Sequence, residues 1–99
     1  MSETLDDKFF DFAFQVLNYA VEFVKSPGYS SLRLTDVLEK TVNLGLEIEG
    51  VERKEFYEKI KERFGARKVL SSSVNREELL DGLLSDFIEE WRARNHLKT

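Results

Sequence analysis

Apolar residues recur at intervals of three and four along most of the chain, which is the spacing of one face of an α-helix. Four such stretches are separated by short segments that contain glycine, proline or serine. They predict helices over about residues 5–25, 34–44, 51–64 and 75–95, with loops at 26–33, 45–50 and 65–74. No long stretch alternates with a period of two, so the predicted fold class is all-α, a four-helix bundle-like domain covering residues 1–99.

Helix-end signals support three of these boundaries. Thr4 is a good N-cap for the first helix, with Asp7 three residues later and Asp6 beside the positive helix end. Gly45 is suited to the position just after the second helix. Asn75 and Glu78 have the spacing of a capping box at the start of the fourth helix.

The first predicted helix carries two neighbouring apolar rows instead of one. The first row consists of Leu5, Phe9, Phe12, Val16, Tyr19 and Phe23. The second row consists of Phe10, Phe14, Leu17, Val21 and Val24. At ~100° per residue the two rows together cover roughly 220° of the helix surface, whereas a helix resting on one layer needs little more than about 100°.

A second surface must therefore cover the second row, because each large apolar side chain left in water forfeits about 1.5–3 kcal/mol. We expect Phe10, Phe14, Leu17, Val21 and Val24 to form a dimer or partner interface, meeting their copies across a two-fold axis. The alternative is that the first helix sits centrally and the other three helices wrap it.

Composition excludes several classes of protein. The chain has 41% hydrophobic residues, no Cys and a net charge of −4, so it predicts a folded domain without disulfides in a reducing cytoplasm. Its acidic beginning does not resemble an export signal, and polar residues interrupt the first helix too often for a membrane span. The excess of Lys, Glu and Arg over one Gln and four Asn suggests a thermophilic source.

Residues with catalytic or metal-binding chemistry are few. His96, the single imidazole, lies three residues from the end of the chain, where nothing is expected to hold it against a substrate. The carboxylates are interleaved with basic residues in helical spacing, as on solvated helix faces. These are Glu55, Glu58 and Glu62 in the third helix and Asp86, Glu89 and Glu90 in the fourth. We therefore predict no enzyme activity, no catalytic residue, no metal and no cofactor.

Basic residues gather around the third predicted helix and offer an alternative function. Arg53, Lys54, Lys61, Arg67 and Lys68 are the candidate contacts of a small nucleic-acid-binding regulator. Glutamates interrupt the same stretch, whereas a phosphate-binding surface normally lacks acids. Nucleic acid is therefore the less favoured partner.

Two further residues have specific expected environments. Arg33 stands between two leucines and is expected to meet a partner such as Asp36 or a helix C-terminus, either in a structural ion pair or in a ligand contact. Trp91 continues an apolar face of the fourth helix and is expected in the core.

Residues 29–36 read Tyr-Ser-Ser-Leu-Arg-Leu-Thr-Asp, and residues 80–83 read Leu-Asp-Gly-Leu. The pattern resembles the Tyr-Gly-Pro-Phe-Arg-Leu-x-Asp segment and the late Leu-Asp-x-Leu helix of a small helical family, the domain-of-unknown-function family numbered 6092. Ser30 and Ser31 stand where that family has Gly-Pro. The resemblance implies the same helical fold and no assigned activity. Together, these observations predict a non-enzymatic protein-interaction or homodimerisation module.

Overall fold

Four α-helices form the protein in a computed structural model, which describes residues 4–25, 30–65 and 73–98. They are α1 (Leu5–Phe23), α2 (Ser30–Glu47), α3 (Lys54–Gly65) and α4 (Ser73–Lys98). The described residues contain no strand, so the all-α bundle is confirmed.

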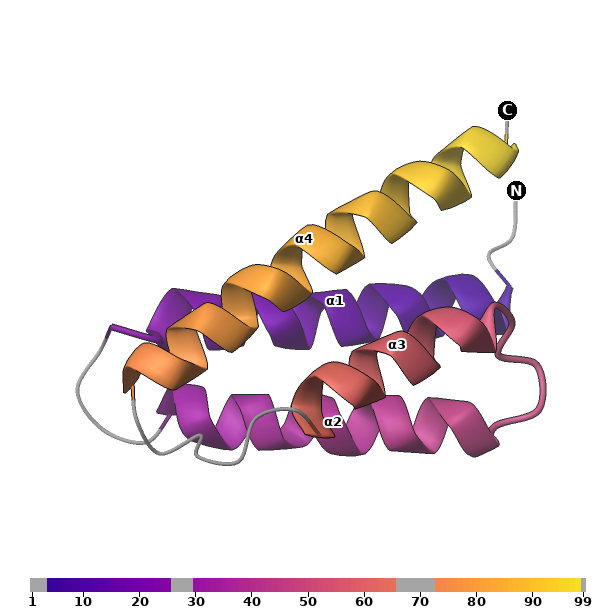
Figure 1. The fold of residues 1–99 in the computed structure, drawn as a ribbon. Helices are drawn as coiled ribbons and strands as arrows, with labels where there is room; N and C mark the ends of the chain where they lie inside the picture. The colour runs from indigo at the N-terminus through magenta and orange to yellow at the C-terminus, as the bar shows by residue number, and fades with distance from the viewer. Residues whose placement is uncertain (1–3, 26–29, 66–72, 99) are drawn as a thin grey trace.

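The helices lie in two layers. Neighbouring antiparallel helices α1 and α2 form one layer, and α3 and α4 pack over the same side of that pair (Figure 1). α4 crosses α1 obliquely, and both chain ends lie at the same end of the bundle (Figure 1). Within residues 4–25, 30–65 and 73–98, no further helix covers the opposite side of the α1–α2 pair.

The core lies between the layers and is rich in aromatic rings. Phe56 of α3 and Phe87 of α4 meet edge to face, with ring centroids 4.9 Å apart. Phe10 of α1 lies 5.6 Å from Phe87 and 5.9 Å from Phe56, centroid to centroid. One continuous cluster of buried apolar residues thus joins α1, α3 and α4, and Leu38 and Val42 add α2 to it.

Helix α1 begins as its sequence predicts. The Thr4 hydroxyl accepts a hydrogen bond from the Asp7 amide at 3.1 Å, and the Asp7 carboxylate accepts one from the Thr4 amide at 3.3 Å. Two amide donors that an N-terminus leaves without helical partners are satisfied in this way.

Helix α2 is longer than predicted at both ends. It begins at Ser30, where a loop was expected, because the buried Ser31 hydroxyl donates to the carbonyl of Ala20 at 2.9 Å and ties the first turn to α1. It also continues past Gly45 to Glu47, so the prediction that Gly45 ends the helix is wrong. A Cβ at Gly45 would lie 2.5 Å from the ring of Phe9, so this glycine serves the close approach of α1 and α2.

The starts of α3 and α4 also differ from the prediction. α3 begins at Lys54 because the preceding residues form a turn, in which Gly50 has a φ of 100° and the Glu52 amide donates to Asp6 at 2.9 Å. α4 already begins at Ser73, so Asn75 is not its N-cap. The side chain of Asn75 lies outside the described ones.

Candidate functional site

The second apolar row of α1 lies inside the chain. Phe10 and Leu17 are fully buried, and Phe14, Val21 and Val24 are partly buried against the core. Placing Phe10 and Leu17 at a partner interface is therefore wrong. The alternative, in which other helices of the same chain cover this row, describes what the fold does.

The exposed apolar surface comes instead from the first row. Leu5, Phe12 and Tyr19 are each more than half exposed, and Phe23 is 39% exposed. Val16 of the same row is buried and Phe9 is partly buried against α2 and α3. α1 therefore has more apolar surface than the other helices of the chain cover, but the exposed part belongs to the first row and not to the second row as predicted.

Two residues of α2 extend this surface. Val37 and Leu44 are 43% and 54% exposed and lie seven residues apart, two helical turns along one line of α2. Helix α1 contacts α2 through Phe9 and Ala20, and it contacts α4 through Phe10 and Phe14. Because successive residues point in different directions around a helix, Phe12 and Tyr19 lie on the side of α1 that faces away from α4. The same reasoning turns Val37 and Leu44 away from α3. We name Leu5, Phe12, Tyr19, Phe23, Val37 and Leu44 the outer apolar face.

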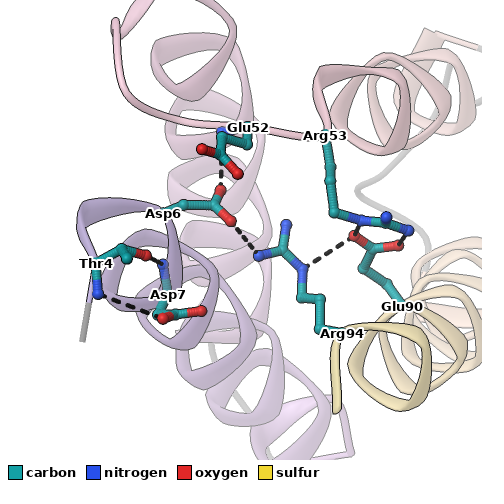
Figure 2. A network of polar contacts seen from close by, with 7 residues as sticks. All are labelled: Thr4, Asp6, Asp7, Glu52, Arg53, Glu90 and Arg94. Atoms are coloured by element: carbon teal, nitrogen blue, oxygen red, sulfur yellow. Dashed lines mark hydrogen bonds and ion pairs between the residues drawn. The ribbon is translucent and has the colours of Figure 1, made fainter. Parts of the chain in front are cut away.

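A buried ionic network stands at the end of the bundle where the two chain termini lie. Arg94 of α4 donates to Asp6 of α1 at 2.7 Å and to Glu90 at 2.9 Å. Glu90 also accepts two hydrogen bonds from Arg53, at 2.6 and 2.9 Å (Figure 2). The Arg94 guanidinium carbon lies 4.3 Å from the centre of the Phe10 ring. Two cations and two carboxylates balance one another, which allows these charges to be buried.

The network is largely buried and connects three parts of the fold. Asp6, Glu90 and Arg94 are all buried, and each is held by a partner from another element or turn. The hydrogen bond and the charge of Glu90 raise the pKa of Arg53 above its ordinary value. The arrangement therefore fixes the N-terminus of α1, the turn before α3 and α4 to one another.

A second ionic cluster joins α3 to α4. Asp86 is buried and accepts hydrogen bonds from Nε and Nη2 of Arg63, while the amine of Lys59 lies 3.4 Å from its carboxylate. Asp86 raises the pKa of Arg63 above its ordinary value. A Cβ at Gly82 would lie 2.9 Å from Arg63 Nη1, so the glycine leaves room for this guanidinium.

These clusters correct the expectation that the carboxylates lie on solvated faces. Glu55, Glu58 and Glu62 are exposed as expected, whereas Asp86 and Glu90 are buried. α4 is rotated so that its charged row enters the interior, and Trp91 is 48% exposed instead of lying in the core. The four-residue spacing of Asp86, Glu90 and Arg94 was the available signal, since it places them in one line beside Phe87.

The predicted pair of Arg33 and Asp36 does not form. Asp36 accepts from Lys40, one helical turn further along α2, and both Asp36 and Arg33 are exposed. The i,i+4 spacing brings Lys40 directly beside Asp36 on the helix surface.

The basic residues do not form one open cationic surface. Arg53 is bound to Glu90, and Lys54 donates to the carbonyl of Leu46 at 3.1 Å. Lys61 is exposed beside the exposed Glu62. Arg67 and Lys68 lie outside the described residues.

Other candidate chemistry is similarly sparse in the described part of the chain. His96 is exposed in the last turns of α4. Among residues 4–25, 30–65 and 73–98, no group of three His, Asp or Glu side chains could hold a metal ion. None of the helices there combines the length and the apolar character needed to cross a membrane.

Compared with protein-family models, with curated proteins and with solved structures, the chain matches none. The resemblance of residues 29–36 and 80–83 to family 6092 therefore stays a prediction, and residue 29 lies outside the described residues. The outer apolar face is the feature that the fold itself does not explain.

Proposed function

We propose that this protein works by binding another protein through its outer apolar face, and not by catalysis. The observation that carries the proposal is the exposure of Phe12 and Leu44, at 54% each, on the side of the α1–α2 pair that none of the described helices covers. Burying such a side chain is worth about 1.5–3 kcal/mol. A partner that covers the row gains this energy, which is what a binding module requires.

The buried ionic network around Arg94 supports a binding role, because it fixes α1, one of the two helices that present the face. Asp6 at the start of α1 is fixed to both α4 and the turn before α3. A preorganised surface loses less entropy on binding than a mobile one. We place this activity in the cytoplasm, since a chain without Cys suits a reducing compartment.

The substitutions Phe12→Gln and Phe10→Ala separate a binding surface from the core. In dilute protein, Phe12→Gln should change the free energy of unfolding by less than about 0.5 kcal/mol, as surface substitutions do. Phe10→Ala should lower it by about 3–5 kcal/mol, because it empties part of a packed core. Chemical denaturation followed by the fluorescence of Trp91 gives both values. A loss for Phe12→Gln as large as that for Phe10→Ala would show that Phe12 belongs to the fold.

Binding itself is tested with a photo-crosslinking amino acid in place of Phe12, and in a control in place of the exposed Glu58 of α3. In extract of the native cell, position 12 should form defined protein adducts that position 58 does not. The mass of each adduct then shows whether the cross-linked partner is a second copy of this chain or a different protein. Equal labelling at the two positions would exclude the outer apolar face as a binding surface.

A further inference from the structure

We infer that the partner of the outer apolar face is a second copy of this chain, packed about a two-fold axis parallel to α1 and α2. This inference rests on the proposed function and names the occupant of the same face. In this arrangement α1 of one copy lies against α2 of the other. The evidence is the pattern of charges that borders the face.

Two polar rows with seven-residue spacing border the face, one on each helix. On α1 the row is Lys8, Gln15 and Glu22. Each of them follows a residue of the face, Leu5, Phe12 or Tyr19, by three positions and so lies beside it on the helix surface. On α2 the row is Arg33, Lys40 and Glu47, which flanks Val37 and Leu44. All six residues are exposed. Seven-residue spacing of apolar positions with flanking charges is the pattern by which helices pair side by side.

The register of the antiparallel pair places these rows at matching heights. Ala20 of α1 lies beside Ser31 of α2, and Phe9 lies beside Gly45. Glu22 therefore stands near the level of Arg33, and Lys8 near the level of Glu47. Within one chain the two rows lie on opposite outer edges of the α1–α2 pair, and Lys8, Glu22, Arg33 and Glu47 form no ion pair with any described residue.

A two-fold axis parallel to the helices keeps each residue at its height and brings the α1 edge of one copy onto the α2 edge of the other. Lys8 then faces Glu47 of the second copy, Glu22 faces its Arg33, and Gln15 faces its Lys40. The symmetry repeats each contact, so four opposite-charge pairs border the interface. Phe12 and Tyr19 meet Leu44 and Val37 of the second copy between these rows.

The other face-to-face arrangement has the axis perpendicular to the helices and is electrostatically worse. It pairs α1 with α1 antiparallel, which joins Lys8 to Glu22 favourably. The same axis passes at the height of Gln15 and Lys40, so it pairs α2 with α2 about Lys40. This joins Arg33 to Glu47 of the second copy, but it also brings Lys40 against Lys40 of the second copy, a like-charge contact that the parallel axis avoids. Like charges across an interface are destabilising, so the charge pattern favours the parallel axis.

Charge reversal tests the pairing. Glu22→Lys and Arg33→Glu should each weaken self-association by about tenfold, because each breaks two ion pairs of roughly 0.2–1 kcal/mol and replaces them with like charges. An equimolar mixture of the two variants should recover wild-type affinity in sedimentation velocity, since a mixed dimer pairs Lys with Glu and Glu with Arg. Glu58→Lys on α3 is the matched control and should associate normally.

Disulfide trapping tests the axis, because the natural chain has no Cys. A mixture of Gln15→Cys and Lys40→Cys proteins should form a mixed disulfide under mild oxidation, and neither variant should cross-link efficiently alone. Efficient cross-linking of Gln15→Cys with itself would establish the antiparallel α1 pairing and overturn this axis.

Failure of the inference differs from failure of the proposed function. A wild-type chain that stays monomeric up to about 100 µM, well above the micromolar range of transient contacts, overturns the second copy as partner. Adducts of a different protein at position 12 would then leave the binding function standing. A monomer without adducts at position 12 removes both.

Discussion

Arg53 has a backbone φ of 52°, in the left-handed region that residues with a Cβ seldom occupy. The conformation costs about 1–2 kcal/mol. Its guanidinium forms two hydrogen bonds with the buried Glu90, and its carbonyl accepts from the Phe56 amide at 3.0 Å at the start of α3. The ion pair and the helix start together hold a strained residue in place.

Gly45 shows how one missing methyl group sets the distance between two helices. Gly45→Ala should lower the free energy of unfolding by about 1–2 kcal/mol, because the new Cβ collides with the ring of Phe9 and overpacking outweighs the gain in helix propensity. Urea denaturation measures the change. Gly65→Ala is the control: nothing lies within 4 Å of its Cβ, so its stability should be unchanged or slightly raised. Equal effects at the two sites would contradict the steric argument.

Tyr57 predicts an alkaline limit to stability. Its side chain is fully buried, its hydroxyl has no hydrogen-bond partner, and burial raises its pKa well above the ordinary value of 10.0. At a pH between the ordinary pKa and the raised pKa of Tyr57, the unfolded chain has lost a proton that the folded chain keeps. The free energy of unfolding must therefore fall as the pH rises above about 10. Denaturant melts at pH 8 to 11 measure the slope.

Tyr57→Phe removes the ionising group and should flatten that decline. The substitution also removes a buried hydroxyl without a hydrogen bond, so the stability near pH 8 should be unchanged or higher. Parallel declines in the two proteins would assign the alkaline limit to other groups.

At the scale of the elements, Arg94 links α4 to α1. Its hydrogen bond to Asp6 joins residues 88 positions apart in the chain, while its bond to Glu90 spans one turn of α4. α4 accordingly turns its charged row inward and leaves Trp91 half exposed. The apolar pattern read by itself places Leu83 and Phe87 in the core, as the structure does, but it leaves the charged row outside, since charged residues are normally exposed.

Arg94→Met should lower the free energy of unfolding by about 3–5 kcal/mol. The substitution keeps most of the side-chain volume, but it leaves Asp6 and Glu90 buried with less compensating charge. Thermal or urea unfolding measures the loss. Lys40→Met breaks the exposed pair with Asp36 and should cost less than about 0.5 kcal/mol. A small loss for Arg94→Met would show that the buried network contributes little to stability.

At the scale of the whole molecule, the two layers leave one side uncovered. α3 and α4 pack over the inner side of the α1–α2 pair (Figure 1). The exposed residues of the outer apolar face lie on the other side. The two layers therefore bury one core between them, but they leave the apolar side chains of the outer apolar face exposed. In the dimer that we propose, a second copy closes this side with a four-helix interface built from α1 and α2 of each chain.

Stability should therefore depend on protein concentration. If the folded state is a dimer, each tenfold rise in concentration above the dissociation constant should add about 1.4 kcal/mol per dimer to the free energy of unfolding. Thermal melts over a hundredfold range of concentration check this. The double variant Phe12→Gln/Leu44→Gln should melt at one temperature throughout. A wild-type midpoint that does not move would contradict a stable dimer.

Local patterns sufficed for the number and type of elements. The helical spacing of apolar residues located four helices, and the Thr4–Asp7 pair located the start of α1 within its own turn. The excess of apolar surface on the first helix was also visible, because periodicity gives the angular width of a face directly.

Only the tertiary structure decided which part of each face is buried. The packing of α3 and α4 on α1 covered Phe10 and left Phe12 exposed, and the buried pair of Ser31 with Ala20 extended α2 beyond its expected start. Charged residues entered the core because partners distant in the chain arrived there together, as Arg94 and Asp6 did. Helix spacing describes one element at a time, whereas the angle, register and charge partners between elements depend on all of them.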